Sequence, residues 1–368
     1  MNTILKLPAA LIRGGTSKGL FFEENDLPSA GEKRDALLLK IMGSPDSTAM
    51  QLNGMGGGIS STSKVALISK SKRPNIDINY LFGQVSLKEP SIDWQGSCGN
   101  LAAAAGLYAI NKGYVKTNND GSAKVKIWQA NLGHEIHLDM LSPAIESNLI
   151  NIPGVPGKSA GIFVDFISPG DSLIPDGKPV HDLILSNGRK IAATLILGAN
   201  PTIFINPAEL ELSGKELAKE IDFKKIEHLI NAIAMAGAAI MNIPYTPAIR
   251  VSWITEAEDY TTVDDIFIEQ NSTDILARIS AEGRVHHAYT GTGAINLACA
   301  AKIPDSIPFN IIKAKRQSKD APIKIGHPAG VMQVNAEVVF DPSKDNWIAL
   351  RSGFMRTAKI LMIGDVYV

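Results

Sequence analysis

Cysteine is scarce in this chain of 368 residues, which contains only Cys98 and Cys299. Two cysteines so far apart form neither a CxxC motif nor the framework of a disulfide-rich protein. Ligand pairs at zinc-binding spacing are missing as well, so the sequence predicts no metal site.

An excess of charge of either sign is also missing. The 36 basic and 37 acidic residues give a formal net charge of −1, which offers no support for a nucleic-acid partner. The longest apolar run, residues 232–241, is too short to span a bilayer, and the first 13 residues contain no apolar core of signal-peptide length. We therefore expect a cytoplasmic protein with neither a membrane nor a nucleic-acid partner.

What the chain does contain is typical of a large globular protein. Hydrophobic residues make up 45% of it and charged residues 20%, which is ordinary for soluble domains. A chain of this length usually forms two domains rather than one.

Cys98 lies in a short loop, residues 96–100, that leads directly into an alanine-rich run with high helix propensity. This position at a helix N-terminus offers unpaired N–H groups and partial positive charge, which can hold an anion and favour a thiolate. A small buried hydrophobic residue is the alternative, because free cysteine often packs in cores. The stretch alone leaves both interpretations open.

Two glycine-rich loops come before this stretch. The loop over residues 13–19 joins two predicted strands, and its Arg13 and Lys18 favour an acidic ligand. The loop over residues 54–64 presents hydroxyl groups and Lys64, but it is no P-loop, because the lysine follows the hydroxyl residues. Such loops let the backbone approach a ligand, and they are equally compatible with plain turns.

The second half of the chain repeats the pattern of the first. Residues 193–205 resemble residues 10–21, and residues 289–298 resemble residues 97–103, with Thr290 at the position of Cys98. Helices are predicted over 32–42 and 215–241, and hairpins over 124–141 and 330–340. Cys299 lies inside the second alanine-rich helix, where we expect it to be a packing residue.

Residues 143–160, rich in Pro, Gly, Ser and Asn, form the predicted linker. The tail over residues 347–368 has strand character and no counterpart after the first hairpin. We expect it to return to the first half and complete its sheet. The predicted domains are therefore 1–150 with 347–368, and 151–346.

Several of these motifs together resemble the PrpF family of methylaconitate isomerases. They are residues 13–19, 54–57, 60–64, 80–85, 98–100 and 326–328, and the similarity runs over nearly the whole chain. The resemblance implies the α/β (α+β) fold of diaminopimelate epimerase. That fold has two pseudo-symmetric domains, each with a sheet rolled around a central helix, and an active site in the interdomain cleft.

In that epimerase, two cysteines face each other across the cleft. Cys98 matches the first, but Thr290 stands in place of the second, which argues against a symmetric two-cysteine racemase. The resemblance implies instead that one cysteine works with a lysine, and the matching lysine is Lys64.

The implied reaction is proton transfer on a small unsaturated di- or tricarboxylate, 2-methylaconitate or aconitate, without a cofactor. Lys64 and Cys98 would be the catalytic residues, with the assignment of base and acid left open. Fixed N–H donors stabilise developing negative charge, so residues near the two helix N-termini would hold the substrate. The candidate substrate-binding residues are Thr16, Ser17, Lys18, Ser60, Ser61, Gly99, Asn100, Thr290, Gly291, Thr292 and His327.

Alternatives remain within and outside this class. A 4-oxalomesaconate tautomerase and a 3-methylitaconate delta-isomerase share the same motifs. A non-catalytic two-domain acid-binding protein would use the same loops and helix ends, although it would not need Lys64 and Cys98. One of His286 and His287 could face the site, and His327 could be a structural loop residue. The sequence leaves a homodimer open.

Overall fold

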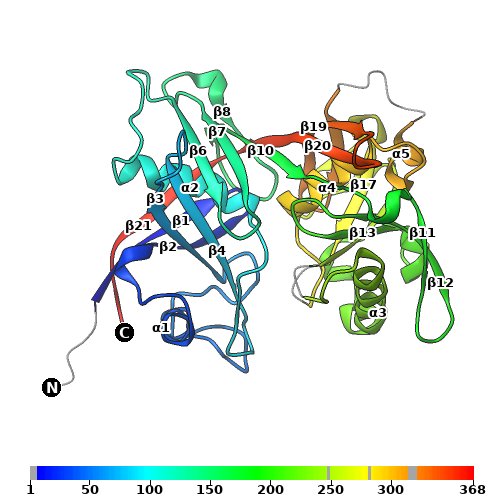
Figure 1. Ribbon diagram of the computed structural model, residues 1–368, viewed down its shortest axis with the longest axis horizontal. Helices are drawn as coiled ribbons and strands as arrows, with labels where there is room; N and C mark the ends of the chain where they lie inside the picture. The colour runs from blue at the N-terminus through cyan, green and yellow to red at the C-terminus, as the bar shows by residue number, and fades with distance from the viewer. Residues whose placement is uncertain (1–5, 247–248, 281–282, 314–320) are drawn as a thin grey trace. The chain divides into compact units, whose positions relative to one another are not determined.

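The computed structural model describes residues 6–246, 249–280, 283–313 and 321–368. The chain forms two compact units (Figure 1). We call Met1–Val164 with Met355–Val368 unit 1, and Asp165–Phe354 unit 2. Both limits come later in the chain than the expected ones at residues 150 and 346.

Unit 1 is built on a mixed sheet. Its strands are β1 Lys6–Gly14, β2 Ser17–Glu23, β3 Lys64–Lys70, β4 Ile78–Val85, β5 Ile92–Asp93, β6 Ala123–Gln129, β7 His134–Met140 and β21 Ala358–Tyr367. The pairs β1–β2, β3–β4 and β6–β7 are antiparallel, whereas β2–β3 and β4–β6 are parallel. Strand β5 pairs with β4. Strand β21 pairs with β1, so the expectation that the tail completes the sheet of the first half is confirmed.

Unit 2 repeats this order of pairings. Its main strands are β11 His181–Ile184, β12 Lys190–Ile196, β13 Thr202–Ile205, β14 Arg250–Glu256, β17 Ile275–Ile279, β18 Ile323–His327 and β19 Gly330–Asp341. The pairs β12–β13, β14–β17 and β18–β19 are antiparallel, and β13–β14 and β17–β18 are parallel. Strand β11 pairs with β12. Antiparallel and parallel strand pairs thus alternate in the same order in both units. This shared order confirms the duplication predicted from the sequence.

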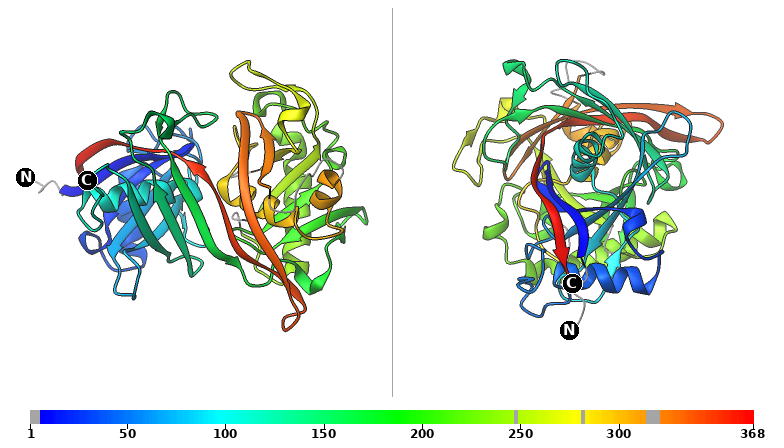
Figure 2. Two further views of the ribbon diagram at one scale, coloured as in Figure 1. Left: turned by 90° about the horizontal axis from the view of Figure 1, so that it is seen from above. Right: turned by 90° about the vertical axis from the view of Figure 1, so that its left-hand side faces the viewer.

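Helices provide the crossover connections that parallel strand pairs require. They are α1 Glu32–Met42, α2 Gly99–Asn111, α3 Phe223–Met241, α4 Gly291–Ala300 and the short α5 Ile307–Ile312. Helix α2 joins β4 to β6, and α4 lies between β17 and β18 in the chain. The two alanine-rich helices are central: α2 contacts the strands of unit 1 and α4 those of unit 2 (Figure 2). Small side chains allow this, since all ten residues of α4 are buried.

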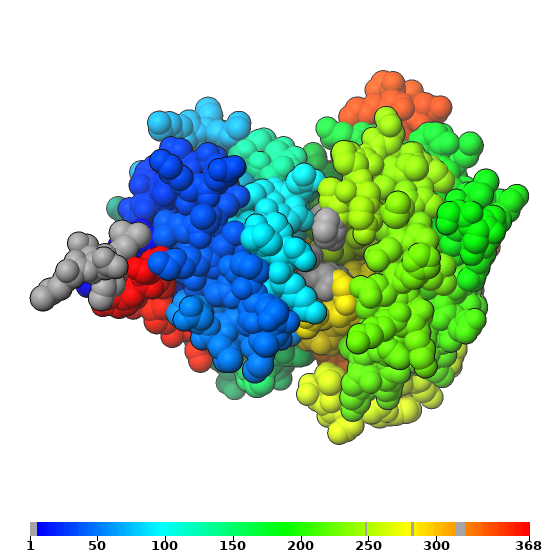
Figure 3. Space-filling view, turned by 90° about the horizontal axis from the view of Figure 1, so that it is seen from below, coloured from blue at the N-terminus to red at the C-terminus, as the bar shows by residue number. Residues whose placement is uncertain are grey.

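The outer helices α1 and α3 pack on the other side of their sheets. Leu38 and Met42 of α1 join Phe22 and Leu67 of the sheet in one core cluster, and full burial of each such side chain contributes about 1.5–3 kcal/mol. Gly43, in a left-handed conformation at φ 74°, ends α1 as predicted. Figure 3 shows the part of unit 1 that contains α1 in blue, at the surface.

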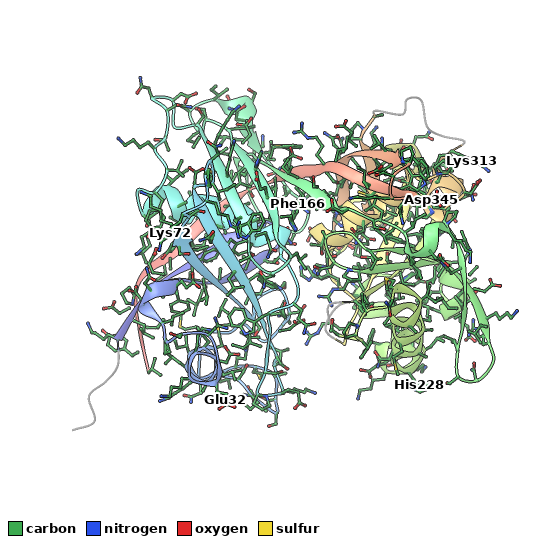
Figure 4. The ribbon with its side chains drawn as sticks, in the orientation of Figure 1. Glu32, Lys72, Phe166, His228, Lys313 and Asp345 are labelled. Atoms are coloured by element: carbon green, nitrogen blue, oxygen red, sulfur yellow. The ribbon has the colours of Figure 1, made fainter. Side chains whose placement is uncertain are left out.

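The remaining strands connect the two units or form short pairs outside the main sheets. They are β8 Leu149–Ile150, β9 Ser159–Ala160, β10 Ile162–Gly170, β15 Tyr260–Thr261, β16 Phe267–Ile268 and β20 Asn346–Arg356. Strands β10 and β20 each begin in one unit and end in the other. In unit 2, Phe166 of β10, labelled in Figure 4, has its ring centroid 6.2 Å from that of Phe354 of β20.

The plain-turn alternative is confirmed for residues 13–19, because Arg13 pairs with Lys18 and only two residues separate β1 from β2. Two other local predictions were wrong. The predicted hairpin over 330–340 is the single strand β19, since the turn comes earlier in the chain, at residues 328–329 between the paired His327 and Gly330. Helix α3 begins at Phe223 rather than at residue 215. The carbonyl oxygens just inside the predicted start, those of Lys215 and Glu216, accept hydrogen bonds from Arg278 instead, each over 2.8 Å.

Candidate active site

Lys64 begins β3 and its side chain is buried, with 8% of the residue exposed. It stands directly opposite Gln84 in the antiparallel pairing of β3 and β4. Its Nζ donates a hydrogen bond to Oε1 of Gln84 and lies 4.9 Å from the centroid of the Phe82 ring. The ammonium group is therefore held inside unit 1 rather than at a solvated strand end.

Cys98 is the N-cap residue of α2, as the sequence predicts, with φ −127° and ψ 96°. Its side chain makes no capping hydrogen bond, so the sulfur is not engaged by the helix backbone. The carbonyl oxygen of Cys98 accepts hydrogen bonds from Ala102 N over 3.1 Å and from the Tyr80 hydroxyl over 3.2 Å. These contacts fix the backbone that carries the thiol.

Asn100, in the first turn of α2, connects this helix to the turn between β1 and β2. Its Nδ2 lies 3.1 Å from Oγ1 of Thr16 and 3.5 Å from Oγ of Ser17. Its Oδ1 accepts a hydrogen bond of 2.7 Å from Nε of Arg356. Because arginine can only donate, this bond settles which side of the amide faces the two hydroxyl groups.

Arg356 was not selected from the sequence. It is 6% exposed, and its Nη1 also donates to the carbonyl oxygen of Met355 over 2.8 Å. Burial lowers the pKa of Arg356 to about 9, and the interaction with Cys98 opposes this change. The sequence predicts only that the tail completes the sheet of the first half, which does not identify Arg356 as a neighbour of Asn100.

The close approach of the β1–β2 turn to α2 explains two glycines. A Cβ atom on Gly14 would lie 2.2 Å from the backbone oxygen of Asn100, and one on Gly15 would lie 2.3 Å from Oδ1 of the same residue. Gly15 also has a positive φ of 50°. The glycines of this turn are therefore needed for packing against the start of the helix.

The hydroxyl loop before β3 is tied to the same region. Lys18 N donates to the carbonyl oxygen of Ser61 over 2.9 Å. Nε2 of Gln84 donates to the carbonyl oxygens of Ser60 and Ser63 over 3.1 and 2.9 Å. The structure thus brings together the predicted residues of unit 1, although Ser60 and Ser61 make these contacts through their backbones.

The predicted residues of unit 2 lie around the start of α4. Thr290 is the N-cap of α4, the place that Cys98 takes at α2, and its Oγ1 accepts a hydrogen bond of 3.1 Å from Gly293 N. Gly291 and Thr292 follow it in the first turn and are buried. Cys299 lies deep in the helix, where burial raises the pKa of its thiol to about 12, so its predicted packing role is confirmed.

His327 ends β18 and is 3% exposed. Its Nδ1 accepts a hydrogen bond of 3.2 Å from Ala329 N, which leaves the proton of a neutral ring on Nε2. His286 makes the corresponding bond to Ala288 N over 3.1 Å. Its ring stacks on that of His287, with centroids 4.6 Å apart. The hydrogen bonds from Ala329 N and Ala288 N hold the rings of His327 and His286 within their own turns.

Other features of the described chain lie apart from these residues. A pocket of about 770 Å³ beside α1 is lined by residues that lie between positions 36 and 53, among them Lys40, Asp46 and Leu52, and by none of the predicted site. Over the described ranges, no three His, Cys, Asp or Glu residues could together hold a metal ion.

Over those same ranges, no helix is long and apolar enough to cross a membrane. Lys72, just after β3, is exposed (Figure 4).

Comparisons with known proteins identify relatives of full length. The family model described as PrpF protein matches residues 4–368. A 2-methyl-aconitate isomerase of Shewanella oneidensis is 35% identical, over 99% of this chain and 97% of that protein. A 3-methylitaconate isomerase of Eubacterium barkeri is 31% identical, over 100% and 98%.

Solved structures that resemble this chain also include an isomerase of an unsaturated acid. The crystal structure of a methylitaconate-delta-isomerase has a TM-score of 0.74 at 30% identity, covering 99% of this chain and 96% of that one. A hydroxyproline epimerase from Agrobacterium vitis, with a TM-score of 0.56 at 12% identity over 99% and 93%, shows the shared fold alone. The fold is therefore that of the diaminopimelate epimerase-like superfamily, as expected. Since the family match spans residues 4–368 and the full-length relatives are named as isomerases, this chain belongs to the PrpF family and is an isomerase.

Proposed function

We propose that this isomerase moves a proton on a small unsaturated polycarboxylic acid, with 2-methylaconitate or aconitate as its substrate and with no cofactor. The observation that carries the proposal is the pair of 2-methyl-aconitate isomerases, from Shewanella oneidensis and Cupriavidus necator, each 35% identical over 99% of this chain. The 3-methylitaconate isomerase and a 4-oxalomesaconate tautomerase of Pseudomonas putida, at 31% and 28% identity, support the alternatives. We also propose that the enzyme is cytoplasmic.

The chemistry follows from the acid itself. When a base removes a proton from a carbon next to the alkene, the electron pair left behind spreads over the alkene and its conjugated carboxylate. Return of the proton to the same carbon, after rotation about the loosened double bond, exchanges cis and trans forms. Return to the far carbon moves the double bond instead. Neither outcome oxidises or reduces the substrate, so the acid provides its own electron sink.

Lys64 and Cys98 are the groups that we assign to the proton transfers. Both lie in unit 1, and each is buried and held by neighbouring groups. A positioned acid or base contributes typically ~10²–10⁴-fold to the rate. The pH–rate profile of Gln84→Glu distinguishes which of the two removes the proton and which returns it.

We assign the substrate carboxylates to the residues at the helix N-termini. At α2, the backbone N–H groups of Gly99 and Asn100 combine with the hydroxyl groups of Thr16 and Ser17. Fixed donors of this kind contribute about 3–4 kcal/mol each where charge develops in the transition state. The remaining candidate ligands are Lys18, Ser60, Ser61, Thr290, Gly291, Thr292 and His327.

Proton NMR in D₂O tests this function directly. The purified enzyme would be incubated separately with cis- and trans-aconitate, their 2-methyl analogues, 3-methylitaconate and 4-oxalomesaconate. We expect deuterium uptake and isomer formation with a methylaconitate or with aconitate. Both should be lost in Lys64→Ala and Cys98→Ser, with the fold of each variant checked by circular dichroism.

Turnover of only 3-methylitaconate or 4-oxalomesaconate would replace the proposed substrate with that alternative. Binding of an acid without exchange in the folded wild type would instead support the acid-binding interpretation. Full activity of both variants would contradict the assignment of Lys64 and Cys98.

A further inference from the structure

One face of β4 supports both residues that we assign to proton transfer. Side chains of a strand alternate between its two faces, so Tyr80, Phe82 and Gln84 share one face. All three are buried. Tyr80 donates its hydroxyl proton to the carbonyl oxygen of Cys98, the ring of Phe82 lies beside Lys64 Nζ, and Gln84 accepts a hydrogen bond from that Nζ.

The side-chain amide of Gln84 is fixed at both ends. Its Nε2 donates to the carbonyl oxygens of Ser60 and Ser63 over 3.1 and 2.9 Å. Since a carbonyl oxygen can only accept, the amide cannot turn over without losing both bonds. Oε1 must therefore face Lys64, and the same amide joins the ammonium group to the hydroxyl loop that precedes β3.

From this geometry we propose that Gln84 is the positioning residue of Lys64: its locked amide sets where Nζ points and supplies the acceptor that stabilises the ammonium form. The inference rests on the proposed function only in so far as Lys64 is a catalytic residue. It gives a function to the motif over residues 80–85, for which the sequence alone predicts none.

The neighbours of Gln84 keep this arrangement rigid. The side-chain amide of Asn131 makes two hydrogen bonds with the backbone of Phe82: its Oδ1 accepts from Phe82 N over 2.9 Å, and its Nδ2 donates to Phe82 O over 2.8 Å. Gly83, between Phe82 and Gln84, leaves no room for a side chain, because a Cβ there would lie 2.8 Å from both Trp94 and Val65. Burial raises the pKa of Tyr80 well above its usual range, so its hydroxyl remains a donor to Cys98.

The titratable residues on the described elements around Lys64 come from four strands and one helix. They are Lys18 and Glu23 on β2, Lys70 on β3, Tyr80 on β4, Asp93 on β5 opposite Gln84, Tyr108 on α2 and Cys98 just before α2. These groups are the same in the wild type and in the Gln84 variants, so a difference in the titration of Lys64 between them is due to residue 84.

A titration of Lys64 tests the proposal without any substrate. The ¹³Cε resonance of Lys64, assigned by its loss in Lys64→Arg, would be followed against pH in the wild type and two variants. In Gln84→Glu a carboxylate beside Nζ should make Lys64 titrate at a pH about 1 to 3 units higher. In Gln84→Met the acceptor is lost, so Lys64 should titrate at a lower pH.

Asn79→Asp is the matched control. It makes the same change from amide to carboxylate on the same strand, but on the opposite face, where Asn79 contacts Ser69. We expect this variant to leave the titration of Lys64 unchanged. Coincident titration of Lys64 in the wild type and in both Gln84 variants would overturn the proposal.

Kinetics provide a second readout. Once a substrate is found, Gln84→Met should lower kcat by about 10- to 100-fold, as expected for a misplaced catalytic group, with KM changed by less than about threefold. In Gln84→Glu, the limb of the pH–rate profile due to Lys64 should move to higher pH. If that is the acidic limb, Lys64 acts as the base; if it is the alkaline limb, Lys64 acts as the acid. Unchanged kcat and limbs in folded variants would count against Gln84.

The two hypotheses fail separately. A wild type that turns over none of the acids would contradict the proposed function, while the ¹³C titration would still decide the function of Gln84. An active wild type with no response of Lys64 to Gln84 would contradict this inference alone.

Discussion

Arg356 donates a hydrogen bond from Nε to the amide oxygen of Asn100 over 2.7 Å, although 256 positions separate the two residues in the chain. The tail thereby brings a buried guanidinium group to the start of α2, where the helix already carries partial positive charge. Two positive features at one place favour an anionic ligand. This relationship agrees with a carboxylic acid as substrate.

Removing this cation should weaken binding of the acid. Charge-assisted hydrogen bonds contribute about 1.5–3 kcal/mol, so we expect Arg356→Met to raise KM by about 10- to 100-fold, and Arg356→Lys to raise it less. Lys359→Met is the control, because it removes an exposed positive charge from the following strand, β21. An unchanged KM in a folded Arg356→Met protein would show that the guanidinium has no effect on the substrate.

Gly14→Ala should disturb the start of α2. The new Cβ would lie 2.2 Å from the backbone oxygen of Asn100, and overpacking of this kind costs about 1–3 kcal/mol. Urea denaturation should show that loss of stability, together with reduced activity. Gly364→Ala, where the nearest atom is Met362 Sδ at 3.4 Å, should be close to neutral. Equal stabilities of the two variants would contradict the close packing of this turn.

Thr290 should contribute to stability through its cap. Thr290→Ala removes the acceptor of the 3.1 Å bond from Gly293 N, which costs about 1 kcal/mol in comparable helices. Thr290→Ser keeps the hydroxyl and should retain most of that free energy of unfolding. The comparison of denaturation midpoints checks this, and an alanine variant as stable as the serine variant would be inconsistent with the cap.

His134 should make the protein sensitive to acid. Burial lowers the pKa of His134 from 6.5 to about 4. Between these pH values the unfolded chain binds a proton that the folded one does not, so stability falls as the pH falls. Over that range the loss amounts to about 3 kcal/mol. His134→Gln should lose correspondingly less stability between pH 7 and pH 4 in denaturant titrations, whereas parallel pH curves would contradict this origin.

Local patterns were enough to locate the parts of the site that depend on sequence neighbours. The loop followed by an alanine-rich run placed Cys98 and Thr290 correctly at two helix N-termini, because capping and helix propensity are local properties. The duplication was visible for the same reason. Lys64 was selected through the family resemblance rather than through its own neighbours.

The partners of these residues could not be found in this way. Gln84 meets Lys64 because of strand register, and Arg356 meets Asn100 because the tail returns to β1. Both depend on pairings between distant segments. The start of α3 was missed for a similar reason, since Arg278 takes the carbonyl groups of residues 215 and 216.

The return of β21 to β1 has a consequence for synthesis. The ribosome makes all of unit 2, Asp165–Phe354, before it reaches the segment that completes the sheet of unit 1. While unit 2 is translated, the edge of β1 that pairs with β21 therefore has no partner strand from the tail. Arg356 arrives with that last segment, so the surroundings of Cys98 are completed only after nearly all of the chain has been made.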